Sequence, residues 1–287
     1  MERGRCGTLL IEMNETTEKV FPDYEKPPVV EVVSGIQFES IKDLTGPNLS
    51  LLGEKFRADY PSIKEVMPLA PALESFNEAA PTREMASFDH MFGLTRYWFE
   101  RNDGNGLIQV QKDRFLHNWR KAKDSDKYPH YDHVIGNFRS CLKTFESFLD
   151  EKNLGKIQPT QFELTYVNHI LKGEGWETFD DLGNIFQDFF RRGGKTRFLP
   201  HPEAINWQTS FRLPGRMGRL RISSRLGKRK TDEVPVILLE LTARGVSPDD
   251  PQASMWTWFD MAHEWIVCGF ADLTTETIQK NVWRRKR

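Results

Sequence analysis

Seven basic side chains fall within residues 215–230, and no acidic residue interrupts them. In an extended strand, side chains alternate between the two faces. Leu220 and Ile222 would therefore face one side, and Arg219 and Arg221 would face the other, open side. Arginine forks match the paired oxygens of phosphates and carboxylates. We predict a partner-binding row of Arg216, Arg219, Arg221, Arg225, Lys228, Arg229 and Lys230.

Charge is segregated along the chain. The formal net charge is −1, yet residues 191–230 hold twelve basic side chains and one acidic side chain, Glu203, so the other 247 residues sum to −12. Segregation of this kind favours an acidic partner, either a protein or a nucleic acid. Two other interpretations stay open: the arginines pair with carboxylates of the same chain, or they protect an edge strand from aggregation.

The sequence contains only fragments of the motifs for phosphate-binding loops and metal-dependent nucleases. Gly194-Lys195-Thr196 matches the end of a phosphate-binding loop, but that pattern needs glycine where the chain has Phe189. The paired carboxylates at 247–251 precede a predicted helix, which suits an N-cap better than a nuclease. No nucleophile elbow stands out. We predict no catalytic residue and no cofactor, and enzymatic activity stays an open question.

The histidines fall short of metal-site patterns. His263 begins the motif of zinc proteases, but the fourth residue after it is Val267. His130 and His133 share a predicted helix with Cys141, without the second ligand pair that zinc requires. We therefore predict no metal site, and we expect His263 to hydrogen-bond a neighbouring side chain.

Hydrophobic periodicity and turn residues indicate the elements that must position these groups. Predicted strands lie at 29–38, on both sides of the turn at 102–106, and at 161–170, 205–213, 218–226 and 234–244; predicted helices lie near 51–60, 134–149, 176–194 and 254–273. Residues 61–84 are ambiguous and could hold one irregular strand. Trp258 and Trp265 share the apolar stripe of the last helix, whereas Trp256 falls off it and is either exposed or in contact with the other half.

The order of these elements repeats. Both halves read strand, helix, strands, helix, which predicts an α+β fold with two similar halves, a mainly antiparallel curved sheet and helices on one face. This order is similar to TATA-binding-protein-like and helix-grip folds. The predicted parts are a disordered N-terminal extension at 1–22, with Met13 as the natural start, a first half at 23–155, a second half at 156–275 and a basic C-terminal tail at 276–287.

Composition bears on the compartment. No apolar run approaches the roughly 18 residues of a membrane helix. The three cysteines, Cys6, Cys141 and Cys268, are widely spaced and argue against a disulfide framework. We expect a cytoplasmic protein without a membrane partner, and a dimer is among its possible oligomeric states.

Five segments carry a resemblance to a known family: YEKPPVVEVV, DRFLHNW, YPHYDHV, YVNHI and FDMAHEWIVCGFADLTTETIQKNVWRR. Between Tyr24 and Arg285 the chain resembles a sporadically distributed bacterial family of uncharacterised function. The resemblance implies a bacterial cytoplasmic protein, and the family's patchy distribution implies mobile or defence-associated genes. It supplies no activity and no catalytic residue.

These observations lead to one expected function and one alternative. The expected function is a non-enzymatic binding or accessory protein that presents the arginine-rich strand to an acidic partner, in a defence or toxin–antitoxin context. The alternative is an enzyme that acts on a phosphorylated or nucleotide substrate oriented by the same arginines. A concave pocket beside the arginines, containing a group with a shifted pKa, would favour the enzyme.

Overall fold

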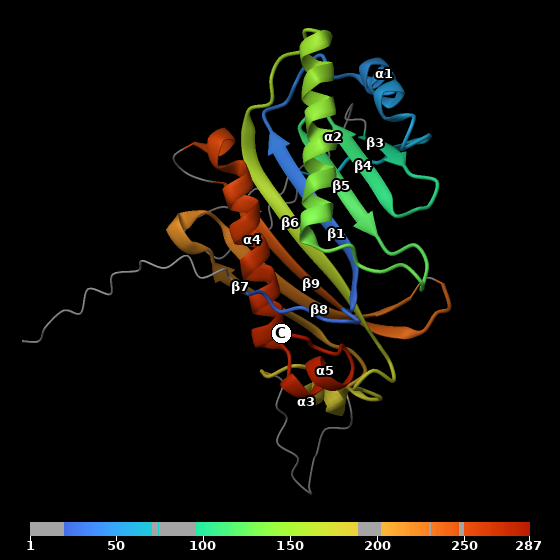
Figure 1. The fold of residues 1–287 in the computed structure, drawn as a ribbon, viewed down its shortest axis with the longest axis vertical. Helices are drawn as coiled ribbons and strands as arrows, with labels where there is room; N and C mark the ends of the chain where they lie inside the picture. Colours follow the sequence, from blue (N-terminus) through green and yellow to red (C-terminus); the bar gives the residue numbers. More distant parts are fainter. Residues whose placement is uncertain (1–19, 71–73, 75–95, 189–201, 230, 247–249) are drawn as a thin grey trace, which may run out of the picture.

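The computed structural model describes residues 20–70, 74, 96–188, 202–229, 231–246 and 250–287 (Figure 1). Its strands are β1 (Val29–Phe38), β2 (Ser62–Val66), β3 (Arg96–Glu100), β4 (Gly106–Gln111), β5 (Arg114–Arg120), β6 (Pro159–Leu171), β7 (Asn206–Arg212), β8 (Arg219–Lys228) and β9 (Pro235–Gly245). Its helices are α1 (Gly46–Phe56), α2 (Tyr131–Glu151), α3 (Leu182–Ile185), α4 (Pro251–Leu273) and α5 (Glu276–Asn281).

All the described strands form one antiparallel sheet in the order β2-β3-β4-β5-β1-β6-β9-β8-β7. β1 and β6 pair along most of their length at the centre, and each is the first strand of its half. Outward from this central pair, the first half continues with β5, β4, β3 and β2, and the second half with β9, β8 and β7. In each half the last strand therefore lies next to the first. The structure therefore confirms an α+β fold with two similar halves, which share one open, curved sheet.

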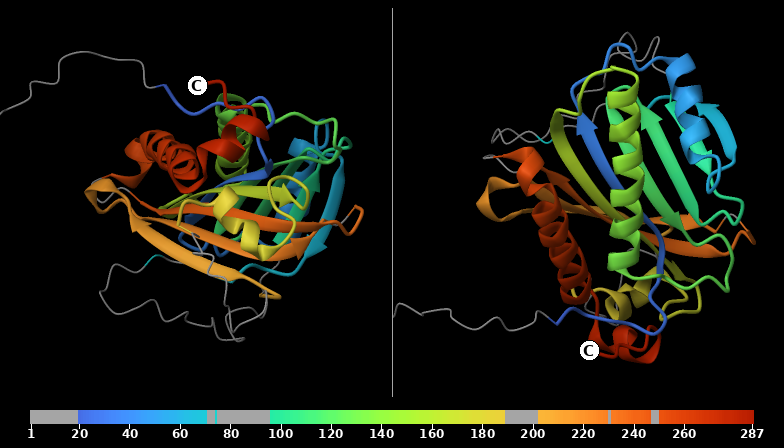
Figure 2. Two further views of the ribbon diagram at one scale, coloured as in Figure 1. Left: turned by 90° about the horizontal axis from the view of Figure 1, so that it is seen from below. Right: turned by 45° about the horizontal axis from the view of Figure 1, so that its top comes forward.

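The two long helices cover the same face of the sheet (Figures 1 and 2). They contact each other through Phe138 of α2 and Phe259 of α4, whose ring centroids lie 5.3 Å apart. Phe162 of β6 packs beneath them, 5.8 Å from Phe259. Trp258 is buried in this core, as predicted, and Trp256 packs against Phe138 of the other half. Aromatic packing therefore fixes how the helices sit over the β1–β6 junction.

Two predicted elements differ from the structure. The helix expected over 176–194 is wrong for its described part: a 3₁₀ turn at Phe179–Asp181 and the short α3 replace it, and Phe186 is extended. The last residues of that predicted helix, 189–194, lie outside the described residues. β5 was not anticipated, because its polar His117 and Asn118 are buried and hide the alternation of a half-buried strand.

The described ends of the chain pair with each other. An isolated bridge joins Tyr24 to Arg285, and the Lys286 amide donates to the Asp23 carbonyl at 2.8 Å. Trp283 is only 1% exposed, so the predicted basic tail is anchored in the core. We call residues 20–28 together with 283–287 the terminal strap; it runs beside the lower ends of α2 and α4 (Figure 1).

None of the helices in the described ranges has the length and apolarity needed to cross a membrane.

Candidate functional site

The arginine strand alternates as predicted, but two of its arginines are already paired. Leu220 and Ile222 are buried on the side of the helices, and Arg219 and Arg221 lie on the opposite side of the sheet. There the Glu74 carboxylate accepts from Arg219 at 3.1 Å and from Arg221 at 2.5 and 3.0 Å. The Glu74 side chain is 4% exposed. This pairing is one of the interpretations left open above, and it removes two guanidinium groups from the free surface.

The face opposite the helices is also less open than expected. Gln111 of β4 exchanges hydrogen bonds with the backbone of Leu69, and Arg114 of β5 donates to the Ala70 carbonyl at 3.2 Å. Gln161 of β6 accepts from the Glu74 amide at 2.7 Å. Leu69, Ala70 and Glu74 therefore lie over this face, and its central polar side chains are buried rather than exposed to water.

The remaining members of the predicted row have different environments. Arg229 pairs with Asp232 and Asp124, and Lys228 pairs with Glu233 at 3.4 Å in an exposed ion pair. Arg216 and Arg225 are exposed, and neither has an ion-pair partner among the residues that the structure describes. Lys230 lies outside the described residues. The six described members of the predicted row therefore do not form one continuous free surface.

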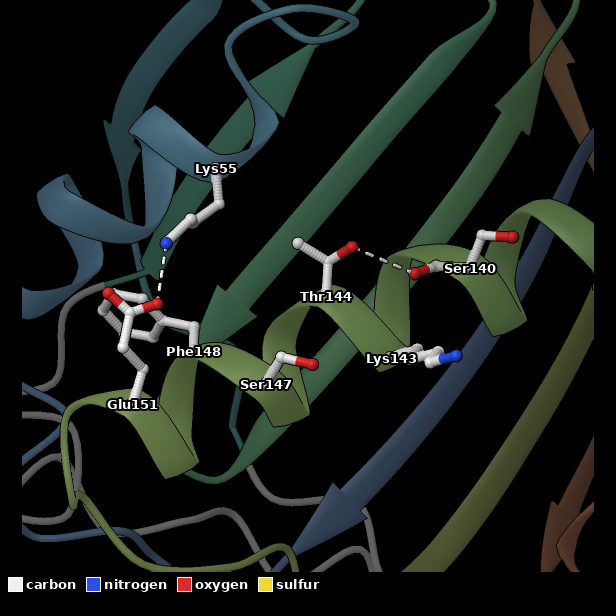
Figure 3. A pocket seen from close by; sticks show the side chains of 7 residues that line it. All are labelled: Lys55, Ser140, Lys143, Thr144, Ser147, Phe148 and Glu151. Atoms are coloured by element: carbon white, nitrogen blue, oxygen red, sulfur yellow. Dashed lines mark hydrogen bonds and ion pairs between the residues drawn. The ribbon is translucent and has the colours of Figure 1, made fainter.

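A small hollow lies beside α2 (Figure 3). It measures about 340 Å³, and its walls include Lys55 from α1 and Glu151 from α2, which pair at 2.7 Å. Thr144 donates back to the Ser140 carbonyl at 3.2 Å, one turn earlier. These groups bind partners of their own chain, so the hollow is an ordinary groove between helices.

A larger cleft opens between α2 and α4, on the face of the sheet opposite the arginines. Its volume is about 920 Å³, within the range of small-molecule sites. β6 and β9 supply its floor through Tyr166, Asn168 and Leu241, and the terminal strap closes one side. The helices contribute the polar and aromatic wall residues Tyr131, Asp132, Thr257, Asp260, His263, Glu264 and Trp265, together with the apolar Met261. Tyr128 and His130, which precede α2, also line the cleft.

A chain of hydrogen bonds links three side chains of this cleft. The hydroxyls of Tyr128 and Tyr166 lie 2.8 Å apart, and the Tyr166 hydroxyl lies 3.1 Å from Nδ1 of His263. The expected hydrogen bond of His263 to a neighbour is confirmed. Because Nδ1 is engaged, Nε2 is the ring nitrogen left to contact a ligand, as donor or acceptor according to the tautomer.

The two helices also meet at this site. The Tyr131 hydroxyl of α2 donates to Oδ1 of Asp260 on α4 at 2.9 Å. The ring centroids of Phe21, from the strap, and His263 lie 5.5 Å apart, in an edge-to-face arrangement. Phe21 belongs to the predicted disordered extension, so that prediction does not hold at this residue; residues 1–19 lie outside the described part.

The backbone beside the cleft is strained. His130 precedes α2 with φ 66° and ψ 162°, a conformation that is essentially restricted to glycine. A side chain kept there costs about 1–3 kcal/mol, and such outliers concentrate at functional sites. The strained residue therefore lies at the end of α2 that borders the cleft.

Burial keeps the titratable groups of the cluster neutral. It lowers the pKa of His263 to about 4. Burial, with a smaller contribution from the Asp132 carboxylate, raises the pKa of Tyr128, Tyr131 and Tyr166 above their usual value. Near pH 7 the site therefore presents uncharged hydroxyl and imidazole groups.

Sequence reasoning missed this cleft, although it had marked its parts. Three segments that carry the family resemblance, YPHYDHV, YVNHI and FDMAHEW, supply Tyr128 to Asp132, Tyr166 with Asn168, and Asp260 to Trp265. In the sequence these three segments are far apart. They converge only in the fold, where β6 lies between α2 and α4.

No family model, curated protein or solved structure matches this chain.

Proposed function

We propose that the protein binds a small organic molecule in the cleft between α2 and α4 and does not transform it. The observation that carries the proposal is the Tyr128–Tyr166–His263 chain, placed at the wall and floor of a cavity of about 920 Å³. A concave, largely apolar cavity with a few convergent polar groups is the usual form of a small-molecule site.

The electrostatics favour binding over acid–base catalysis. A general base works best when its pKa lies near the working pH. The pKa of His263, near 4, leaves a weakly basic neutral ring, and the raised pKa values of the tyrosines keep their hydroxyls protonated. Such groups are suited to orienting a ligand through hydrogen bonds. They are poorly suited to removing its protons.

The alternative of a phosphate-handling enzyme has less support. Arg219 and Arg221 lie across the sheet from the cleft and bind Glu74, so they are not placed to orient a substrate there. Arg287 is the one guanidinium among the described cleft residues, and it is exposed at the end of the strap. A phosphate group would find few cationic partners in this cavity.

The proposal is tested by nuclear magnetic resonance titration with a library of small aromatic fragments. We expect selective shifts of the Asn168 side-chain amide and the His263 ring. Thr257→Trp places a bulky group in the cleft and should abolish these shifts, whereas Ala253→Trp, exposed on the same helix and away from the cleft, should retain them. Shifts that persist in Thr257→Trp, or that map to the hollow beside α2, would contradict the proposal.

A second candidate function is docking of an acidic partner at the β7–β8 edge. Arg212, Arg219 and Arg244 stand directly opposite one another on three adjacent strands. Like charges in that arrangement repel and favour an anion between them. Within the described residues, Glu74 pairs with Arg219 and Glu163 pairs with Arg244, whereas Arg212 is exposed.

This second candidate predicts salt-dependent association. Arg212→Glu with Arg225→Glu should abolish capture of an acidic protein or of nucleic acid, and binding to nucleic acid should weaken steeply with salt concentration. Unchanged capture by the double variant would eliminate this candidate and leave the cleft proposal intact.

A further inference from the structure

The charged residues that line the cleft are mainly acidic. They are Asp23, Asp132, Asp260 and Glu264, against the single cation Arg287, so the lining carries a formal charge of −3. Asp23 already pairs with Lys286 at 3.6 Å, on the strap. Asp132 of α2 and Asp260 of α4 are exposed and stand on opposite walls. The cavity therefore favours a positive charge over a negative one.

The floor offers a hydrogen-bond acceptor independent of these carboxylates. Asn168 is 4% exposed and lies on the floor of the cleft. Its side-chain nitrogen donates to the Leu239 carbonyl at 3.2 Å, which fixes the orientation of the amide. Its Oδ1 has no hydrogen-bond partner among the described residues. An amide oxygen held in this way on the floor of the cleft can accept a hydrogen bond from a ligand that donates an N–H or O–H.

Aromatic rings complete the surroundings. Tyr128, Tyr131, Tyr166 and Trp265 lie around the cavity, and Phe21 approaches it from the strap. The faces of aromatic rings attract cations, most strongly where water is excluded. The same rings offer apolar area to a flat or alkyl body. Their combination with carboxylates and a carbonyl acceptor suits a molecule that has a cationic head and an apolar body.

We infer that the ligand of the cleft is an organic ammonium ion, a protonated amine carried on an aromatic or alkyl body. This inference rests on the ligand-binding function proposed above and names its ligand class. The ammonium group donates to Oδ1 of Asn168 and lies between the carboxylates of Asp132 and Asp260. The body of the ligand packs on the tyrosines.

Three probes with closely similar skeletons test the charge of the ligand: 2-phenylethylammonium, 2-phenylethanol and phenylacetate. Titrations at pH 7 follow the Asn168 side-chain amide. We expect the ammonium ion to bind at least fivefold more tightly than the alcohol, and phenylacetate to bind more weakly than both. Raising the salt concentration should reduce the preference for the cation, because exposed carboxylates are screened.

Matched variants locate the effect. Asp132→Asn and Asp260→Asn should each weaken binding of 2-phenylethylammonium about twofold to fivefold and leave 2-phenylethanol unchanged, as expected for exposed charge pairs. Asp150→Asn on α2 and Asp272→Asn on α4 remove the same charge outside the cleft and should change neither. Equal effects of the cleft variants and their controls would overturn the inference.

The outcomes separate this inference from the function on which it rests. If the alcohol or phenylacetate binds as tightly as the ammonium ion and shifts the same cleft residues, the charge assignment fails and the cleft remains a ligand site. If none of the three probes nor any neutral fragment shifts these residues, both proposals fail together.

Discussion

The imidazole of His263 stacks on the ring of Tyr131, with the ring centroids 4.0 Å apart and an angle of 3° between the ring planes. Tyr131 begins α2 and His263 lies in α4, so the stack joins the two helices at the cleft. It works with the hydrogen bond from Tyr131 to Asp260 to set the spacing of the cleft walls. The same contact desolvates His263, which links the neutrality of the site to the packing of the helices.

We predict that stability falls on acidification between about pH 6.5 and pH 4. His263 and His117 have pKa values lowered by burial to about 4, against an ordinary value of 6.5. In this window the unfolded chain binds protons that the folded chain excludes, so the free energy of unfolding decreases as pH falls. Each histidine should remove about 2 kcal/mol between pH 7 and pH 5, measured by urea unfolding.

His263→Gln is the matched test of that window. The variant should lose the His263 share of the pH dependence and keep the His117 share, because these histidines occupy separate parts of the core. A pH dependence identical to that of the wild type would show that His263 is not buried in the neutral form.

Tyr166→Phe should lower the free energy of unfolding by about 2 kcal/mol. The substitution removes the middle hydroxyl of the chain and leaves both the Tyr128 hydroxyl and Nδ1 of His263 without their partner, and each unsatisfied buried group costs about 1–3 kcal/mol. Among the described residues, the Tyr97 hydroxyl hydrogen-bonds only the exposed Ser50, at 3.5 Å, so Tyr97→Phe should cost less than about 0.5 kcal/mol. Equal costs for both variants would count against a cooperative chain.

His130→Gly should raise the free energy of unfolding by about 1 kcal/mol, because glycine relieves the positive φ at this position. His133→Gly, inside the first turn of α2, should instead lower it by about 1 kcal/mol through the low helix propensity of glycine. Chemical denaturation measures both. Similar losses in the two variants would refute the assigned strain.

Glu74→Gln should lower the free energy of unfolding by about 3 kcal/mol. Burial acts to raise the pKa of Glu74, but its hydrogen bonds and ion pairs with Arg221 and Arg219 outweigh burial and hold the pKa below its usual value. Removing the charge deprives the largely buried guanidinium groups of Arg219 and Arg221 of their shared carboxylate. Glu233→Gln disturbs an ion pair that is mostly exposed and should change stability by less than about 0.5 kcal/mol. An unchanged free energy of unfolding in Glu74→Gln would contradict the pairing of Glu74 with these arginines.

Local patterns predicted most of the fold. The β-branched run of Val29–Phe38 forms β1, and the Asn/Gly-rich turn at 102–106 joins β3 to β4 as expected. The helix predicted from residue 176 onward was wrong. Its aromatic and aliphatic residues lie at helical spacing, but they contact distant parts of the chain instead of forming one face of a helix. Phe186 forms a bridge with Thr274, and such tertiary contacts override local propensity.

The site was harder to predict than the fold. Alternation placed Arg219 and Arg221 on the correct side of β8, but no local pattern could show that Glu74, 145 residues from Arg219 along the chain, would reach them. Likewise Tyr128, Tyr166 and His263 are widely separated along the chain and meet only through the sheet order. Contacts between distant residues depend on topology, which one sequence specifies only weakly.

The most direct test of the central claim is to locate a bound probe in the cleft. Intermolecular nuclear Overhauser effects with 2-phenylethylammonium should connect its aromatic protons to Tyr166 and its methylene protons to the side-chain amide of Asn168, and Thr257→Trp should abolish them. Effects confined to other surfaces, or unchanged in that variant, would contradict a ligand site between α2 and α4.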